Sequence, residues 1–149
     1  MRTTFTYSKT INIIIVDDNS LFRNVIKRIL EKELSCNIIG EFSNDETLTC
    51  QKYFPQADVI LMDLQMPKMT GILTASRWLE VHPKAKIIAL TLSNYNNYNG
   101  LLKEIGFKGC ICKNNFLDNI IPAIDCVHTG GNYFIDHFHI SHINQLFYN

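Results

Sequence analysis

Short apolar runs alternate along the chain with longer segments of helical periodicity. The apolar runs, rich in β-branched residues, occupy residues 11–16, 36–42, 58–63, 86–92 and 109–112. The helical segments lie between and after them: the first opens at Ser20, and the others span residues 45–54, 71–82, 101–105 and 116–128. Runs without polar alternation are typical of strands buried on both faces of a sheet. The pattern therefore predicts five strands and five helices in strict alternation.

The first helical segment shows its periodicity clearly. Ser20 is a suitable N-cap. The face expected to turn towards the core carries Leu21, Val25, Ile29 and Leu30. The opposite, charged face carries Arg23, Lys27, Arg28 and Glu31. Later segments are expected to stop at proline or glycine, namely at Pro55, Pro83 and Gly130-Gly131.

Alternating strands and helices with short connections predict one α/β fold. Right-handed crossovers place helices on both faces of a parallel sheet. For five strands we expect the flavodoxin-like, doubly wound order 2-1-3-4-5. Such sheets bind ligands beyond the C-terminal ends of their strands, where the strand order reverses.

Composition narrows the functional classes. The chain has 149 residues, enough for one domain, and its 14 basic and 14 acidic side chains balance. No net charge indicates contact with nucleic acid or a membrane surface, and no apolar stretch reaches the length of a membrane span. Because the five cysteines form no disulfide framework and the N-terminus lacks a signal-peptide core, we expect a cytoplasmic protein.

Polar residues gather where the predicted strands end. Asp17 and Asp18 follow the first strand, Asp63 ends the third, Thr91 ends the fourth and Lys113 follows the fifth. In the expected topology these residues meet at one edge of the sheet.

Three converging carboxylates repel one another unless a cation lies among them. Mg²⁺ suits such a site because it prefers oxygen ligands and uses one or two carboxylates. We expect Asp18 and Asp63 to bind it directly, Asp17 directly or through water, and the backbone carbonyl of Gln65 to be a further ligand.

A carboxylate can also act as a nucleophile in phosphoryl transfer. Asp63 is the best placed acceptor because it lies on the central strand, between the acidic pair and the Thr91–Lys113 pair. Mg²⁺ and the Lys113 ammonium would neutralise charge, and the Thr91 hydroxyl would donate a hydrogen bond to a phosphoryl oxygen.

This set of residues resembles the receiver domains of two-component response regulators. The resemblance covers about residues 11–131 and rests on Asp17-Asp18, the stretch DLQMPKMTG that opens with Asp63, then Thr91 and Lys113, all in order. It implies that the acidic pair binds Mg²⁺, that a histidine kinase or phosphotransfer protein phosphorylates Asp63, and that Thr91 and Lys113 read out the phosphate. A receiver is a phosphoacceptor with at most weak autophosphatase activity, not an enzyme.

A finer likeness is to the NarL/LuxR-like subfamily, in the stretches GFKGCICKNN and HTGGNYF. In that subfamily the second stretch leads to a DNA-binding domain, and none follows here. We expect a receiver over residues 1–131 and a tail or linker over residues 132–149, amphipathic and carrying His137, His139 and His142. Either the chain is a stand-alone receiver or it is part of a longer regulator.

One residue departs from the family pattern. Receivers carry Tyr or Phe three residues before the lysine, and its ring swings inward on phosphorylation. Here the position is Cys110, which we interpret as a small core residue rather than a redox site.

Three functions remain open. The first is a phospho-switch whose partner, or a second copy, binds either the face made by the fourth helix, fifth strand and fifth helix or the face made by helices one and five. The second is a phosphorylation-independent interaction module that keeps the fold, which Cys110 favours. The third is a small phosphatase with an aspartate nucleophile. Gln65 argues against it, because it occupies the position where such an enzyme needs an acid/base residue.

Overall fold

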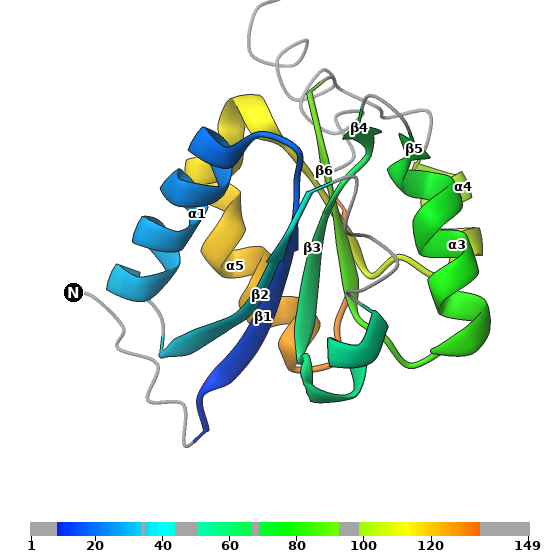
Figure 1. Ribbon diagram of the computed structural model, residues 1–149, viewed down its shortest axis with the longest axis horizontal. Coiled ribbons are helices and arrows are strands. Elements are labelled where there is room, and N and C mark those ends of the chain that lie inside the picture. The colour runs from blue at the N-terminus through cyan, green and yellow to red at the C-terminus, as the bar shows by residue number, and fades with distance from the viewer. Residues whose placement is uncertain (1–8, 34, 44–50, 67–68, 93–98, 135–149) are drawn as a thin grey trace, which may run out of the picture.

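A six-stranded parallel sheet forms the centre of the computed structural model, which describes residues 9–33, 35–43, 51–66, 69–92 and 99–134 (Figure 1). The strands are β1 (Ile11–Val16), β2 (Cys36–Phe42), β3 (Val59–Asp63), β6 (Ile87–Thr91), β7 (Gly109–Cys112) and β8 (Tyr133–Phe134). Their order is β2-β1-β3-β6-β7-β8. The first five strands along the chain thus have the order 2-1-3-4-5, which confirms the predicted flavodoxin-like topology.

Helices cover both faces of the sheet, as expected. Figure 1 shows α1 (Ser20–Glu33) and α5 (Phe116–His128) on one side, and α3 (Gly71–Val81) and α4 (Asn99–Ile105) on the other. Two 3-10 helices, η2 (Gln51–Gln56) and η4 (Lys113–Asn115), precede β3 and α5. A short antiparallel pair, β4 (Gln65–Met66) with β5 (Met69–Thr70), links β3 to α3. Within the described ranges, no helix has the length and apolarity that crossing a membrane requires.

Two apolar layers hold the helices to the sheet. Ile13 and Leu61 belong to the layer beneath α1 and α5, whereas Ile14 and Ile60 belong to the layer beneath α3 and α4. Successive side chains of a strand point to opposite faces. Each apolar run therefore fills both layers, and for this reason the central strands show no polar alternation.

The apolar face of α1 differs from the one that its sequence predicts. Leu21 is 75% and Val25 44% exposed, while Ile26 and Leu30 are fully buried. The prediction for Leu21 and Val25 was wrong because the pattern of apolar residues on α1 is wider than the face that the sheet can cover. Exposed apolar side chains therefore remain near the start of this helix.

The N-cap of α1 is also different from the prediction. The Asn19 Oδ1 atom accepts a hydrogen bond from the Phe22 N–H at 3.1 Å, and the Asn19 carbonyl accepts one from the Arg23 N–H at 3.0 Å. These bonds make Asn19 the N-cap, and Ser20 the first residue of the helix. Both residue types cap well, so only the course of the backbone decides between them.

Some element boundaries shift by one or two residues, and one segment changes type. Residues 44–50 lie outside the described residues, and the described remainder of the second predicted helix is the 3-10 helix η2. Pro55 lies inside η2 rather than ending the segment. Gly130, by contrast, does end α5, with a φ of 100°, a conformation that favours glycine.

Strand β8 is the element that the sequence pattern missed. Tyr133 pairs with Gly109 and Phe134 with Cys110, so the sheet continues beyond Gly131, where the receiver was expected to end. The division at Gly131 stays a prediction. Residues 135–149, which include the three histidines, lie outside the described residues.

Candidate functional site

Two aspartates at the ends of the adjacent strands β1 and β3 each close a tight turn on their own backbone. The Asp17 Oδ1 atom accepts a hydrogen bond from the Asn19 N–H at 2.8 Å. The Asp63 Oδ1 atom accepts one from the Gln65 N–H at 2.9 Å. Each turn uses one carboxylate oxygen and leaves the other, Oδ2, for a partner elsewhere in the site.

That partner is the ammonium group of Lys113, which follows β7. Its Nζ lies 2.7 Å from Asp17 Oδ2 and 3.2 Å from Asp63 Oδ2. The Lys113 side chain is only 10% exposed and Asp17 is fully buried, so water screens these charges weakly. The structure thus brings together Asp17, Asp63 and Lys113, as the topology predicts.

The net effect of this environment is unfavourable for a charged Asp63. Burial is the largest influence and raises the pKa of Asp63 above its ordinary value, and the neighbouring Asp17 charge raises it further. The Gln65 N–H and the Lys113 ammonium act in the opposite direction without cancelling the rise. A cation that joined the pair would favour the ionised form.

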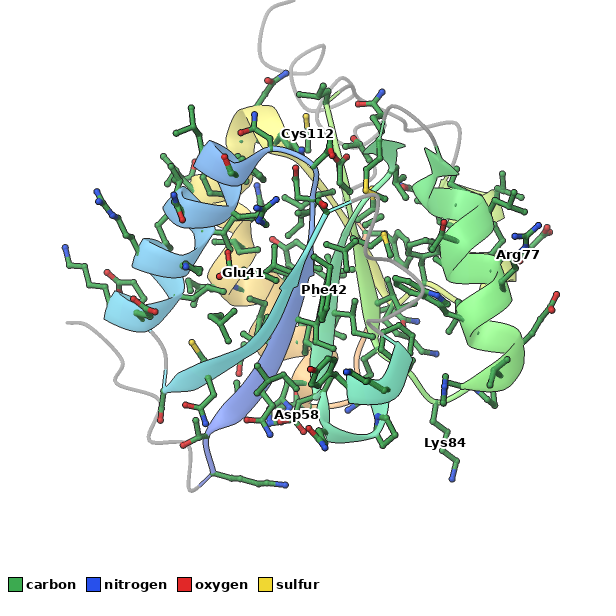
Figure 2. The ribbon with its side chains drawn as sticks, in the orientation of Figure 1. Glu41, Phe42, Asp58, Arg77, Lys84 and Cys112 are labelled. Atoms are coloured by element: carbon green, nitrogen blue, oxygen red, sulfur yellow. The ribbon has the colours of Figure 1, made fainter. Side chains whose placement is uncertain are left out.

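The rim of the site joins the ends of β6 and β7. Gln65 Oε1 accepts a hydrogen bond from the Leu92 N–H at 3.0 Å, and Asn114 Nδ2 donates one to the Leu92 carbonyl at 3.3 Å. Thr91 is buried one residue beyond Leu90, the residue that pairs with Asp63. Figure 2 shows Cys112 at this same end of the sheet.

Gly71, the first residue of α3, has no room for a side chain. A Cβ atom added to Gly71 would lie 2.1 Å from the Asp63 carbonyl oxygen and 2.8 Å from the Leu64 Cα. The start of α3 therefore packs directly on the backbone that carries Asp63. Only glycine permits this approach.

Arg23 and Glu41 support the site, and sequence reasoning did not identify them. The Arg23 Nη1 donates to the Asp17 carbonyl, and its Nε lies 3.6 Å from Glu41 Oε1. Lys27 Nζ lies 2.9 Å from Glu41 Oε2, and Figure 2 shows Glu41 between β2 and α1. The sequence signal was weak because Arg23 and Lys27 read as the ordinary solvated face of a helix.

Comparison with known proteins decides the family. The sequence model of the response regulator receiver domain matches residues 13–125. This chain is a response regulator receiver. The receiver is 34% identical over 125 residues to the transcriptional regulatory protein DegU of Brevibacillus brevis, a match that covers 83% of this chain and 52% of DegU. The receiver therefore spans about half the length of this curated relative.

Solved structures show the same fold. A LuxR-family two-component response regulator from Aurantimonas superposes with a TM-score of 0.77 at 19% identity, over 95% of this receiver and 100% of that chain. The non-phosphorylated receiver domain of RcsB from Escherichia coli gives 0.72 at 25% identity, over 85% and 99% of the two chains. These matches show that the receiver shares the fold of solved response regulators.

The donor set of the receiver fits Mg²⁺ through two carboxylates. Its described residues contain no cluster of three His, Cys, Asp or Glu side chains placed to hold a metal ion. Mg²⁺ needs only one or two carboxylates when water and phosphate oxygens complete its shell. Asp17 Oδ2 is buried and takes part in no hydrogen bond, although the Lys113 ammonium lies beside it. Asp18, expected as a direct ligand, is exposed next to the Asp17–Asp63 pair.

Cys110 lies partly buried on the face of the sheet that α3 and α4 cover, next to Phe134 of β8. Burial, with a smaller contribution from Cys112, raises the pKa of the Cys110 thiol to about 12. A thiol with such a pKa stays protonated at neutral pH and is a poor nucleophile. This environment agrees with a core residue.

Proposed function

We propose that Asp63 accepts a phosphoryl group from a histidine kinase or phosphotransfer protein, and that the receiver signals through the resulting aspartyl phosphate. One observation carries the proposal: Asp17 Oδ2 and Asp63 Oδ2 face a single buried ammonium, that of Lys113, at the C-terminal ends of the strands. Family membership supports the same chemistry, since receivers belong to two-component systems.

In the proposed step, an oxygen of the Asp63 carboxylate forms a bond to phosphorus while the bond from phosphorus to a histidine nitrogen of the donor breaks. The electron pair of that bond stays on the imidazole nitrogen, which takes a proton from water. Lys113 neutralises charge on the phosphoryl oxygens, and the Thr91 hydroxyl donates to one of them.

Mg²⁺ fits this site and, when bound, would neutralise carboxylate and phosphoryl charge. Asp17 and Asp63 are proposed to hold it, with Asp18 and the backbone carbonyl of Gln65 as further ligands. The protein's part is to hold the carboxylates in place, which the Asn19 and Gln65 turns do. Hydrolysis by the receiver itself would be at most a weak autophosphatase activity.

After transfer, the new charge beside Lys113 and Thr91 shifts the receiver between an inactive and an active arrangement of α4, β7 and α5. A partner or a second copy would bind that face. The alternative face lies on α1 and α5, where Leu21 and Leu117 are 75% and 65% exposed. Because the four described cysteines are free thiols, we assign this signalling to the cytoplasm.

A second candidate function is a phosphorylation-independent interaction module, and Cys110 favours it. The small side chain of Cys110 cannot act as the aromatic rotamer switch of other receivers. Such a module would bind its partner equally well with and without an aspartyl phosphate mimic.

The test is phosphoryl uptake from acetyl phosphate with Mg²⁺, measured by intact mass. Wild-type protein should gain the mass of one phosphoryl group, and chelation of the metal should abolish the gain. Asp63→Asn should gain nothing. Asp58→Asn, the same substitution at the other end of the β3 region, should behave like wild type and so exclude a general effect of losing a carboxylate.

Two results would overturn the proposal. One is uptake that persists in Asp63→Asn, which would place the acceptor elsewhere. The other is a wild-type protein that takes no phosphoryl group from either acetyl phosphate or phosphorylated kinase domains, which would favour the interaction module.

A further inference from the structure

An aromatic ring lies against the Lys113 ammonium. The Lys113 Nζ is 4.6 Å from the centroid of the Phe22 ring. Phe22 in turn meets Phe116 edge to face, with centroids 4.9 Å apart and an interplanar angle of 65°. Three elements thus converge on one ammonium group: α1, η4 and the start of α5.

The ring contact does something that a third carboxylate could not do. A cation over an aromatic face is attracted by the quadrupole of the ring, and the ring accepts no conventional hydrogen bond. The N–H donors of Lys113 therefore stay available to Asp17 and Asp63, and the ring adds no negative charge that would neutralise the ammonium. The long lysine stem, which loses rotamer entropy when it is ordered, gains a fixed apolar wall.

The backbone around Phe22 is itself anchored to the site. The Phe22 N–H donates to Asn19 Oδ1, and the Asn19 N–H donates to Asp17 Oδ1. The same short run that shapes the Asp17 turn therefore fixes the root of the Phe22 side chain. A shift of the Phe22 backbone relative to Asp17 would break this pair of bonds.

We propose that Phe22 is a positioning residue for Lys113: its ring, backed by Phe116, holds the ammonium over the Asp17–Asp63 pair. Its effect on phosphoryl uptake rests on the function proposed above, whereas its effect on Lys113 itself does not. This proposal assigns Phe22 no contact with the phosphoryl group: it acts through the lysine.

The first experiment reads the contact directly, by NMR of protein labelled with ¹³C-lysine. Ring currents should shift the ε-methylene protons of Lys113 upfield, and Lys113→Arg identifies the signal by its disappearance. The shift should vanish in Phe22→Leu and persist in Phe22→Tyr. Lys103, whose Nζ lies 5.0 Å from the Phe134 ring, provides a reference in the same spectrum that neither variant should move.

The second experiment measures the rate of phosphoryl uptake from acetyl phosphate as a function of Mg²⁺ concentration. Phe22→Leu should lower the rate at saturating Mg²⁺ about three- to tenfold, the effect of losing one partly buried cation–π contact, and Phe22→Tyr should restore it. Phe54→Leu is the matched control, because Phe54 also meets a ring edge to face, that of Trp78 at 4.6 Å, but on the other face of the sheet. It should leave the rate unchanged.

The outcomes separate the two ideas. A wild-type Lys113 without the upfield shift overturns the positioning role whatever the uptake experiment shows. A Phe22→Leu rate equal to wild type, or a loss that Phe54→Leu reproduces, overturns it as well. If wild-type protein takes up no phosphoryl group while the Lys113 shift depends on Phe22, the proposed function has failed and the positioning of the lysine stands.

Discussion

Two aspartates five residues apart, Asp58 just before β3 and Asp63 at its end, have opposite surroundings. The Asp58 Oδ2 atom accepts a hydrogen bond from the Asn12 N–H at 2.7 Å, and its own N–H donates to the Asn12 carbonyl at 2.8 Å. Asp58 therefore joins β3 to β1 through neutral backbone groups. Asp63 instead faces another carboxylate across a shared ammonium, and its pKa is raised by burial.

Two lysines, Lys86 and Lys113, show the same contrast between the two ends of the sheet. Lys86, just before β6, donates to the His128 carbonyl at 2.9 Å, while Lys113 ion-pairs with two carboxylates. At one end of the sheet Asp58 and Lys86 bond to neutral backbone groups. At the other end charges are held close together at some cost in stability, which is typical of functional sites.

The largest expected effect follows from breaking the functional end alone. Lys113→Met should slow phosphoryl uptake about 10²-fold, because the phosphoryl oxygens lose a fixed positive charge. Lys86→Met, at the other end, should leave the rate unchanged. Stopped-flow or intact-mass kinetics with acetyl phosphate would measure both. Equal rates for the two variants would mean that the ends of the sheet do not differ in the way described.

The next effect concerns stability. Gly71→Ala should lower the free energy of unfolding by at least about 2 kcal/mol, because the new Cβ overlaps the Asp63 carbonyl and forces the backbone to shift. A Cβ atom at Gly100 would have nothing within 4 Å. Gly100→Ala should therefore raise the free energy of unfolding by about 0.5–1 kcal/mol, since alanine favours a helix. Urea titration measures both. A Gly71→Ala protein as stable as wild type would contradict the close packing of α3 on the site.

Asp63→Asn should stabilise the protein at neutral pH by about 0.5–2 kcal/mol, whereas Asp58→Asn should destabilise it by about 1 kcal/mol through a weakened hydrogen bond. The signs differ because the charged form of Asp63 is disfavoured in the folded state. Thermal unfolding of the two variants beside wild type would test this opposition, and two changes of the same sign would contradict it.

The gain in the free energy of unfolding on Asp63→Asn should also depend on pH. A raised pKa means that the folded state binds the Asp63 proton more tightly than the unfolded state. The wild-type free energy of unfolding then falls as pH rises from the ordinary carboxyl value of 3.8 to the raised value, and the cost is constant above it. The gain should therefore be largest above the raised pKa of Asp63 and shrink as the pH falls towards 3.8. A gain that grew on acidification would mean that the folded state binds the Asp63 proton more weakly than the unfolded state.

The smallest expected effect is that of Glu41→Gln. It removes the partner of Arg23 and Lys27, but these ion pairs are partly exposed and worth about 0.2–1 kcal/mol. Uptake should fall less than about threefold, because Arg23 still donates to the Asp17 carbonyl. Added salt should narrow the difference in stability from wild type, and a tenfold loss of uptake would assign Glu41 a larger role.

The parts of the fold that follow from local pattern could be predicted from the sequence. The buried strands, the order of the sheet and the meeting of Asp17, Asp63 and Lys113 all follow from apolar runs and from the rule that parallel strands end at one edge.

The rest depends on contacts that no periodicity encodes. β8 is two residues long, and its pairing with β7 is fixed by tertiary context. Asn and Ser are equally good N-cap residue types, so the sequence does not decide between Asn19 and Ser20. Phe22 reads as an ordinary apolar residue of α1, and its contact with Lys113 of η4 joins two segments that lie far apart in the sequence.

Without β8, β7 would be an edge strand of the sheet. Its row of unpaired N–H and C=O groups would offer a template to a strand of another molecule, which is a common origin of aggregation. β8 pairs with Gly109 and Cys110 of β7, and the Tyr133 hydroxyl donates to Asn119 Oδ1 at 2.7 Å, which fastens the added strand to α5. A version of this protein cut at Gly131 would keep every residue of the acidic site but lose the strand that pairs with β7, so the stretch that completes the sheet is longer than the stretch that carries the chemistry.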